Sequence, residues 1–310
     1  MGHVTEPTMS AYHLPVLLKP VLDAAQGARR VVDGTLGDGG HAEAFRAAGA
    51  EILAIDRDPD AIRTARARLG EAGIRYLEAP FASAEALAEI ADFHSDFIFL
   101  DLGVSSRQLD QEERGFTFRP GAPLDMRMGA EGPTAADLLN TTDKDTLRAW
   151  LAEWGDERRA HRLAGEIVRR REREPFVTSD DLVNAIRGVL GSRSGPDDFA
   201  RIFQTFRIAV NDELDGLAAA LPVLRDAVVP GGVLAVISYH SGEDRVVKQA
   251  FHEWSRSCIC PPPQPVCTCR GRPLGVAVPR SGVVPDPEEI AANPRARSAR
   301  LRMFRTAHDA

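Results

Sequence analysis

The sequence predicts an α/β protein with a mostly parallel, Rossmann-like sheet and an inserted all-helical domain. Short apolar runs alternate with helical patterns over about the first hundred residues, and a glycine-rich loop follows the first run. Roughly a hundred residues of helical pattern then separate these runs from the remaining ones. At 310 residues, of which 44% are apolar, the chain is long enough for two packed units.

The first strands are predicted by short apolar runs, three of which end in an aspartate: Asp33, Asp56 or Asp101. These runs cover residues 30–33, 51–56, 74–78 and 97–101, and apolar residues at helical spacing predict helices over 41–48 and 60–69. Continuous apolar strands linked through helices are typical of a parallel sheet that is covered on both faces. Ligands of such sheets bind at the carboxyl ends of the strands, where the three acids lie.

A different pattern follows Asp101. Residues 103–132 are rich in glycine, proline and charge and have no period. Helices are then predicted over 143–154, 156–174, 179–190 and 197–221, and strands over 232–238 and 298–306. We therefore expect residues 1–106 and 222–310 to form the Rossmann-like domain, and residues 107–221 to form an inserted helical domain for substrate recognition.

The composition excludes several classes of protein. The net charge of −7 excludes a wholly basic nucleic-acid coat, although local basic patches remain compatible with it. No apolar run approaches the ~18 residues of a membrane span. The first residues also lack the apolar segment of a secretory signal. We expect a cytoplasmic protein without a membrane partner. Its oligomeric state is left open, a homodimer included.

The glycine loop predicts a nucleotide-like ligand. Gly37, Gly39 and Ala42 fit the pattern G-x-G-x-x-A between a strand and a helix, and Asp56 follows where a ribose-binding acid belongs. An NAD-dependent oxidoreductase would satisfy this pattern. However, Asp33 ends the first strand, where a carboxylate repels a pyrophosphate and attracts an ammonium or sulfonium group. S-adenosylmethionine (AdoMet) carries both cations, so we expect AdoMet, with NAD as the alternative.

Blocks of sequence spread over nearly the whole chain carry a family resemblance. They are residues 13–18, 33–41, 54–59, 100–110, 114–118, 123–128, 204–208, 237–245 and 293–298. These blocks resemble the bacterial 16S rRNA (cytosine-N4)-methyltransferase family, RsmH or MraW. The resemblance implies a class I AdoMet-dependent methyltransferase fold and 16S rRNA or the small ribosomal subunit as partner. It also implies methylation of the N4 exocyclic amine of a cytidine in the decoding region.

The resemblance further implies a set of cofactor contacts. They are Gly39, Gly40 and His41 for the methionine part, Asp56 for the ribose hydroxyls, Phe81 for the adenine, and Asp101 and Gln108 for the rest of the pocket. Asp33 and Gly37, from the loop pattern, complete the predicted cofactor-binding residues.

The chemistry of amine methylation suggests two catalytic residues. The amine of cytosine is a poor nucleophile, so the enzyme must align it with the methyl group and accept its hydrogen bonds. Asp101 is the first candidate acceptor. Two prolines and an aromatic residue follow this acid in many amino-methyltransferases but not here, so the residue that stacks on the base is not predicted. His240 is the second candidate and Tyr239 offers a stacking face. A catalytically silent RNA-binding or ribosome-assembly factor with a vestigial pocket is the alternative of another class.

Arginines near the C-terminus predict RNA contact. Arg295, Arg297 and Arg300 lie in a stretch that no acid interrupts, and phosphate binding requires such a local positive field. A second arginine-rich stretch, residues 156–173, contains interleaved glutamates and is interpreted as a solvated helix face.

The four cysteines predict a separate feature. All of them, Cys258, Cys260, Cys267 and Cys269, lie in one short segment with the pattern C-x-C, six residues, C-x-C. Four thiols in a proline-rich loop suit a tetrahedral structural zinc site. Two disulfides or four free thiols are the alternatives, and a reducing compartment disfavours the disulfides.

Overall fold

The computed structural model describes residues 15–261, 264 and 266–308, so His13 and Leu14 of the first resembling block lie outside the described residues. Over these residues a seven-stranded sheet has the order β3-β2-β1-β4-β5-β7-β6. The strands are β1 (Arg30–Asp33), β2 (Glu51–Asp56), β3 (Ile74–Glu78), β4 (Ser95–Asp101), β5 (Val228–Ser238), β6 (Gly275–Ala277) and β7 (Arg300–Thr306). The first five strands pair in parallel, and β7 runs antiparallel to β5 and β6. The predicted mostly parallel sheet is therefore confirmed.

The register brings the three predicted acids to one edge of the sheet. Asp33 pairs with Ala54 and Phe99, so it lies two residues before the ends of β2 and β4. Asp56 and Asp101 are the last residues of those two strands. Because parallel strands all point the same way, this carboxyl edge gathers the side chains on which a ligand site can be built.

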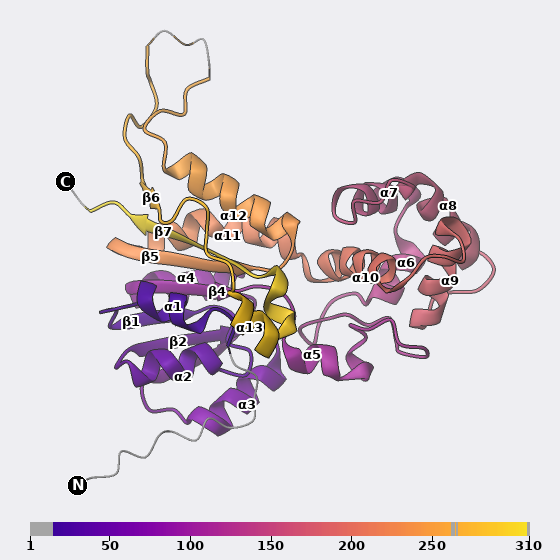
Figure 1. Cartoon of the computed structure of the whole chain (residues 1–310), viewed down its shortest axis with the longest axis horizontal. Helices are drawn as coiled ribbons and strands as arrows, with labels where there is room; N and C mark the ends of the chain where they lie inside the picture. The colour runs from indigo at the N-terminus through magenta and orange to yellow at the C-terminus, as the bar shows by residue number, and fades with distance from the viewer. Residues whose placement is uncertain (1–14, 262–263, 265, 309–310) are drawn as a thin grey trace.

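Helices cover both faces of the sheet, as Figure 1 shows. One core cluster joins a sheet face to α1 (Leu18–Ala24), α2 (Gly40–Ala47) and α3 (Pro59–Leu69). The other joins the opposite face to α4 (Ala84–Phe93), α11 (Glu213–Ala227) and α12 (Ser241–Trp254). Short helical segments complete the arrangement: α5 (Ser106–Asp110), η1 (Glu112–Arg114), α13 (Pro287–Ala292) and η2 (Pro294–Ser298).

The inserted helices form a lobe beside the sheet, on the right of Figure 1. They are α6 (Ala135–Thr141), α7 (Lys144–Glu153), α8 (Ala160–Arg171), α9 (Ser179–Leu190) and α10 (Pro196–Asn211). Their apolar side chains make a third core cluster, to which Leu124 and Met126 also belong. This lobe confirms the predicted all-helical insertion, while its limits at residues 107 and 221 stay a prediction.

Three expectations about individual elements are wrong. The helix expected over 197–221 is two helices, because Asp212 adopts a left-handed conformation (φ 51°) between α10 and α11. Helix α11 then packs its Leu217 and Leu221 against the sheet, not in the lobe. The helix expected from residue 156 begins at Ala160, since Asp156 is also left-handed (φ 45°). Strand β6 was not expected, because its three residues carry no readable pattern.

None of the described helices has the length and apolar character to cross a bilayer.

Candidate functional site at the carboxyl edge of the sheet

A cavity of about 1480 Å³ lies between the carboxyl edge of the sheet and the inserted lobe. Residues of the predicted cofactor site line it together: Gly37, Gly40, His41, Asp56, Phe81, Asp101 and Gln108. The lobe and α11 line it as well, through residues that include Phe116, Phe118, Phe203, Arg207 and Glu213. The cavity is therefore large enough for two ligands side by side, one on the sheet and one against the lobe.

The glycine loop is held against the second strand. Gly37 donates its backbone N–H to Oδ2 of Asp56 at 2.7 Å, which fixes the loop to the end of β2. Gly39 caps α2 with φ 79°, a backbone conformation that favours glycine. A Cβ on Gly40 would lie 2.6 Å from Cγ of Pro15, so any side chain would push apart the loop and the chain before α1. The loop thus presents bare backbone to the cavity.

Three acids lie close together at this edge, where Asp33 is buried and Asp56 and Asp101 are half-buried. Burial raises the pKa of Asp33 to about 8, and the nearby Asp101 and Asp56 add to this shift against the hydrogen bond from Thr35. Burial also raises the pKa of Asp101 to about 7 and that of Asp56 to about 6. Arg57 partly offsets the shift of Asp56, but no arginine or lysine in the described part of the chain pairs with Asp33 or Asp101, so the edge favours a positively charged ligand.

Asp101 is oriented by two neighbours. The hydroxyl of Tyr239 donates to its Oδ1 at 2.8 Å, and Nδ1 of His41 lies 3.8 Å from its Oδ2. Nε2 of His41 lies 3.0 Å from the carbonyl of Val16, which can only accept, so the ring proton is on Nε2. Burial lowers the pKa of His41 to about 4, and the ring is therefore neutral near pH 7. In this form Nδ1 carries a lone pair, so His41 donates no hydrogen bond to Asp101.

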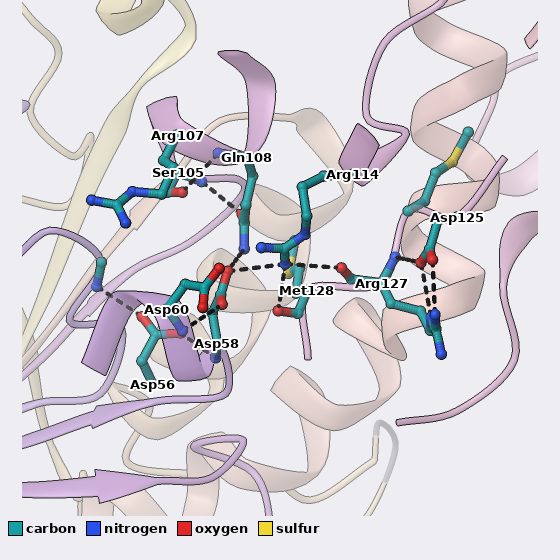
Figure 2. A network of polar contacts seen from close by, with 12 residues as sticks. Asp56, Asp58, Asp60, Ser105, Arg107, Gln108, Arg114, Asp125, Arg127 and Met128 are labelled. Atoms are coloured by element: carbon teal, nitrogen blue, oxygen red, sulfur yellow. Dashed lines mark hydrogen bonds and ion pairs between the residues drawn. The ribbon is translucent and has the colours of Figure 1, made fainter. Parts of the chain in front are cut away.

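A polar network behind the site was not predicted (Figure 2). Asp58 is buried, and its side chain caps α3 by accepting the backbone N–H of Asp60. It also makes an ion pair with Arg114 at 3.0 Å. Arg114 also donates to the carbonyls of residues 127 and 128, at 3.2 and 3.0 Å. The network therefore ties the loop after β2 to the segment that enters the lobe. The pattern Asp-Arg-Asp-Pro indicates a helix cap in the sequence, but it does not reveal the distant arginine.

Gln108 belongs to this network. Its carbonyl accepts the N–H of Ser105 at 2.9 Å in a capping box, and its Nε2 donates to Asp58 at the same distance. Both ends of the amide are thus engaged by protein, although the side chain reaches the cavity wall. The direct cofactor contact predicted for Gln108 stays a prediction, and the observed contacts show it bridging α5 and Asp58.

His240 caps a helix. Its Nδ1 accepts the N–H of Glu243 at 3.4 Å at the start of α12, and its Nε2 lies 3.2 Å from Oε1 of the same residue. Burial opposes ionisation of Glu243, but His240 and then Arg207 lower its pKa below the ordinary value. His240 does not line the cavity, whereas its neighbour Tyr239 does. The catalytic role expected of His240 stays a prediction, and the side chain beside the acid is Tyr239.

Aromatic and charged side chains of the lobe were missed as site residues. Phe118 packs edge-on against Phe203, and both face the cavity. Arg207 makes a bidentate ion pair with Glu213, with both distances 2.8 Å, across the break at Asp212. The resembling block at residues 204–208 is the sequence signal that could have identified this wall.

The C-terminal arginines are paired with acids that lie far away in the sequence. Arg295 makes an ion pair with Asp110 at 2.7 Å and lines the cavity. Nε of Arg300 lies 3.8 Å from Asp244, whose carboxylate also binds the buried Arg302. No acid lies between these arginines in the sequence, but in the folded protein Asp110 and Asp244 approach two of them. Arg297 is exposed, and in the described part of the chain no acid lies within ion-pair distance of it.

Among the arginines of 156–173, Arg169 and Arg170 pair with Glu166, as a solvated helix face requires.

Comparisons with known proteins support these features. The model of the MraW methylase family matches residues 10–307. A "Ribosomal RNA small subunit methyltransferase H" of Gemmatimonas aurantiaca is 58% identical over 301 residues, which cover 96% of each chain. The protein with the same name in Heliobacterium modesticaldum is 42% identical over 95% of this chain and 98% of its own. The solved structure of an rRNA methylase from Streptococcus thermophilus covers 94% of both chains with a TM-score of 0.41 and 10% identity, too low to support an inference.

The strand order, the antiparallel β7 and the inserted lobe agree with the class I AdoMet-dependent methyltransferase fold that the sequence predicts. The family match extends over nearly every element that builds the cavity. This chain therefore belongs to the MraW methylase family.

Proposed function

We propose that this protein transfers the methyl group of AdoMet to the N4 amine of a cytidine in the decoding region of 16S rRNA. The observation that carries the proposal is the cavity between the acidic sheet edge and the lobe, with Asp101 among its lining residues. The shared family and the names of the relatives support an rRNA substrate. We infer a cytoplasmic location, with 16S rRNA or the small subunit as the partner.

The residues present fit AdoMet. Asp101 lines the cavity and Asp33 is buried behind it, and no arginine or lysine pairs with either among the described residues, so the sulfonium and ammonium groups of AdoMet would supply the missing positive charge. Gly40 and His41 line the cavity where the methionine part would lie, and Phe81 lies on its wall where an adenine ring could pack. Asp56 accepts from Gly37 and Asp58 and keeps lone pairs for the ribose hydroxyls. When bound, AdoMet supplies an electrophilic methyl group.

The chain's own residues then have three tasks. Asp101 accepts a hydrogen bond from the cytosine amine, holds it in line, and takes its proton as the nitrogen becomes cationic. The hydroxyl of Tyr239 donates to Oδ1 of Asp101, which leaves Oδ2, the oxygen nearer His41, to accept the hydrogen bond of the amine. The phenylalanines of the lobe exclude water and offer faces for an extracted base.

The direct test is methyl transfer from labelled AdoMet to small-subunit rRNA, presented both as free RNA and as assembled particles. The product is digested to nucleosides and identified by mass spectrometry. N4-methylcytidine at one decoding-region position supports the proposal. Methylation at carbon 5, or binding of NAD with no methyl transfer to either substrate, would overturn it.

The ribose contact gives a prediction for cofactor affinity. Asp56→Ala is expected to weaken AdoMet binding by ~1.5–3 kcal/mol, the scale of hydrogen bonds to a charged acceptor. Isothermal titration measures the dissociation constant. Asp60→Ala is the matched control, since Asp60 pairs with the exposed Arg63 and does not line the cavity. An unchanged constant in Asp56→Ala would show that the ribose is held elsewhere.

The C-terminal arginines give a prediction for RNA binding. Changing Arg295, Arg297 and Arg300 together to Ala is expected to lower RNA affinity. The slope of log affinity against log salt concentration should become shallower by the amount that corresponds to about two to three lost phosphate contacts. The control changes the same number of charges on and beside α3: Arg63, Arg66 and Arg75, which pair with local acids. Binding is measured at several salt concentrations. A salt slope equal to that of the wild type would remove this stretch from the RNA face.

A further inference from the structure

The four cysteines lie close together in the segment between α12 and β6, which projects from the sheet domain at the top of Figure 1. The loop leaves α12 and returns to β6. The Sγ atom of Cys267 lies 3.4 Å from that of Cys269, 3.7 Å from that of Cys258 and 3.9 Å from that of Cys260. All four sulfurs lie within 4.8 Å of one another. One sulfur is thus nearly equidistant from the other three.

This spacing is that of a tetrahedral metal site. A zinc ion binds thiolate sulfur at about 2.3 Å, so the sulfurs at the corners of the tetrahedron are about 3.8 Å apart. The three distances from Cys267 lie around this value. Disulfides would instead join the sulfurs in pairs at about 2.05 Å, and none of the three distances from Cys267 is that short. All four cysteines are free in the structure.

The surrounding backbone organises the loop for such a site. The N–H of Ile259 points at Sγ of Cys269 at 3.3 Å, a hydrogen bond that favours a thiolate. At the base of the loop, Arg270 donates to the carbonyls of Glu253 and Arg256 at the end of α12. The N–H of Leu274 donates to the carbonyl of Trp254 at 2.9 Å. Both ends of the loop are therefore fixed to the domain, and the sulfurs are brought together above that base.

The loop has little apolar packing of its own. The side chains of Val266 and Ile259 are 69% and 38% exposed, although both are large and apolar. A segment without a core needs another source of stability, and metal binding supplies it directly, because ligands that are separated in the unfolded chain are gathered by the ion.

We propose that Cys258, Cys260, Cys267 and Cys269 bind one zinc ion and that the ion fixes the fold of this loop. The site is structural, since four thiolates fill the coordination sphere and leave no position open for a substrate or water. Soft sulfur ligands in tetrahedral arrangement select zinc over magnesium or calcium. The cysteines do not line the cavity, so the ion takes no part in the methyl transfer proposed above.

The test begins with metal analysis of the full chain purified without chelator. About one equivalent of zinc per chain is expected, as for other four-cysteine sites, and none in the variant with all four cysteines changed to serine. Reconstitution with cobalt adds a spectroscopic readout, because tetrahedral thiolate coordination gives intense visible and near-ultraviolet bands. Zinc well below one equivalent, equal zinc in the serine variant, or intact disulfides in the non-reduced protein would overturn the proposal.

A second measurement separates the loop from the rest of the enzyme. Limited proteolysis should cut residues 258–269 much faster in the serine variant, or after chelation, than in the zinc-bound protein. AdoMet affinity should be unchanged in both cases, because its pocket is built from other segments. Equal cleavage rates with and without the metal would show that zinc does not order the loop. A loss of AdoMet affinity would contradict the separation of the two sites.

Discussion

Replacing Asp101 with Asn is expected to reduce kcat by roughly 100- to 10,000-fold, the range lost when a positioned proton acceptor is removed. Asparagine keeps the shape of the side chain but cannot take the proton of the cytosine amine. Its amide also replaces one of the two carboxylate oxygens that face Tyr239 and His41 with an NH2 group. AdoMet affinity is expected to change much less than turnover. Single-turnover methyl transfer gives the rate, and titration of the same protein gives the affinity.

Tyr239→Phe is the matched variant for this prediction. The hydroxyl of Tyr239 lowers the pKa of Asp101 against the larger raising effect of burial. Its removal should raise that pKa further and move the acid limb of the kcat profile to higher pH, while part of the activity survives at alkaline pH. If Asp101→Asn weakens only cofactor binding, or if the pH profile of Tyr239→Phe stays in place, Asp101 is not the proton acceptor.

The ligand-free protein is expected to lose stability as the pH rises from about 6 to 8, by on the order of 2–4 kcal/mol. Burial raises the pKa values of Asp33, Asp101 and Asp56 from 3.8 to about 8, 7 and 6. The folded state therefore holds protons that the unfolded state has already released. This stabilising contribution is complete below the unfolded pKa values and is lost as the pH passes through the folded ones. Urea unfolding at a series of pH values measures it.

Cofactor binding should reverse this loss. A cationic ligand stabilises the ionised acids, so AdoMet should bind more tightly as the pH rises through this range and should release protons on binding. S-adenosylhomocysteine lacks the sulfonium charge and should release fewer. Calorimetry in two buffers with different ionisation enthalpies counts the protons. Asp33→Asn, which keeps the side-chain shape, should flatten both dependences. Stability that increases from pH 6 to 8 would contradict the buried cluster as described.

The sequence predicts the sheet edge well for a local reason. Strands β1, β2 and β3 have the predicted bounds, because each is a short apolar run closed by a polar residue. The parallel arrangement then places Asp33, Asp56 and Asp101 together without further information. The glycine loop is recognisable from a short pattern, although Asp56 and Pro15 also hold it in place.

Features that depend on distant contacts were not predictable in the same way. The ion pair of Asp58 with Arg114 and that of Arg295 with Asp110 join residues whose proximity is set only by the complete fold. The break at Asp212 is hidden because apolar residues continue at helical spacing on both sides, although the two halves pack on different cores. His240 shows a further limit, since the same residue type serves as a helix cap or as a base and only its contacts distinguish the two.

The pairing of β4 with β5 has a consequence for the folding kinetics. These neighbouring strands lie next to each other in the sheet, yet the whole inserted lobe separates them along the chain, as in the pair Phe97 and Val233. Closing so long a flexible loop is entropically costly and slow. A lobe that has already collapsed around its own core brings its two ends close and shortens the loop that remains to be closed. We therefore expect the helical lobe to gain protection from hydrogen exchange before the β4–β5 ladder, so that the acidic edge at Asp101 is completed late during folding.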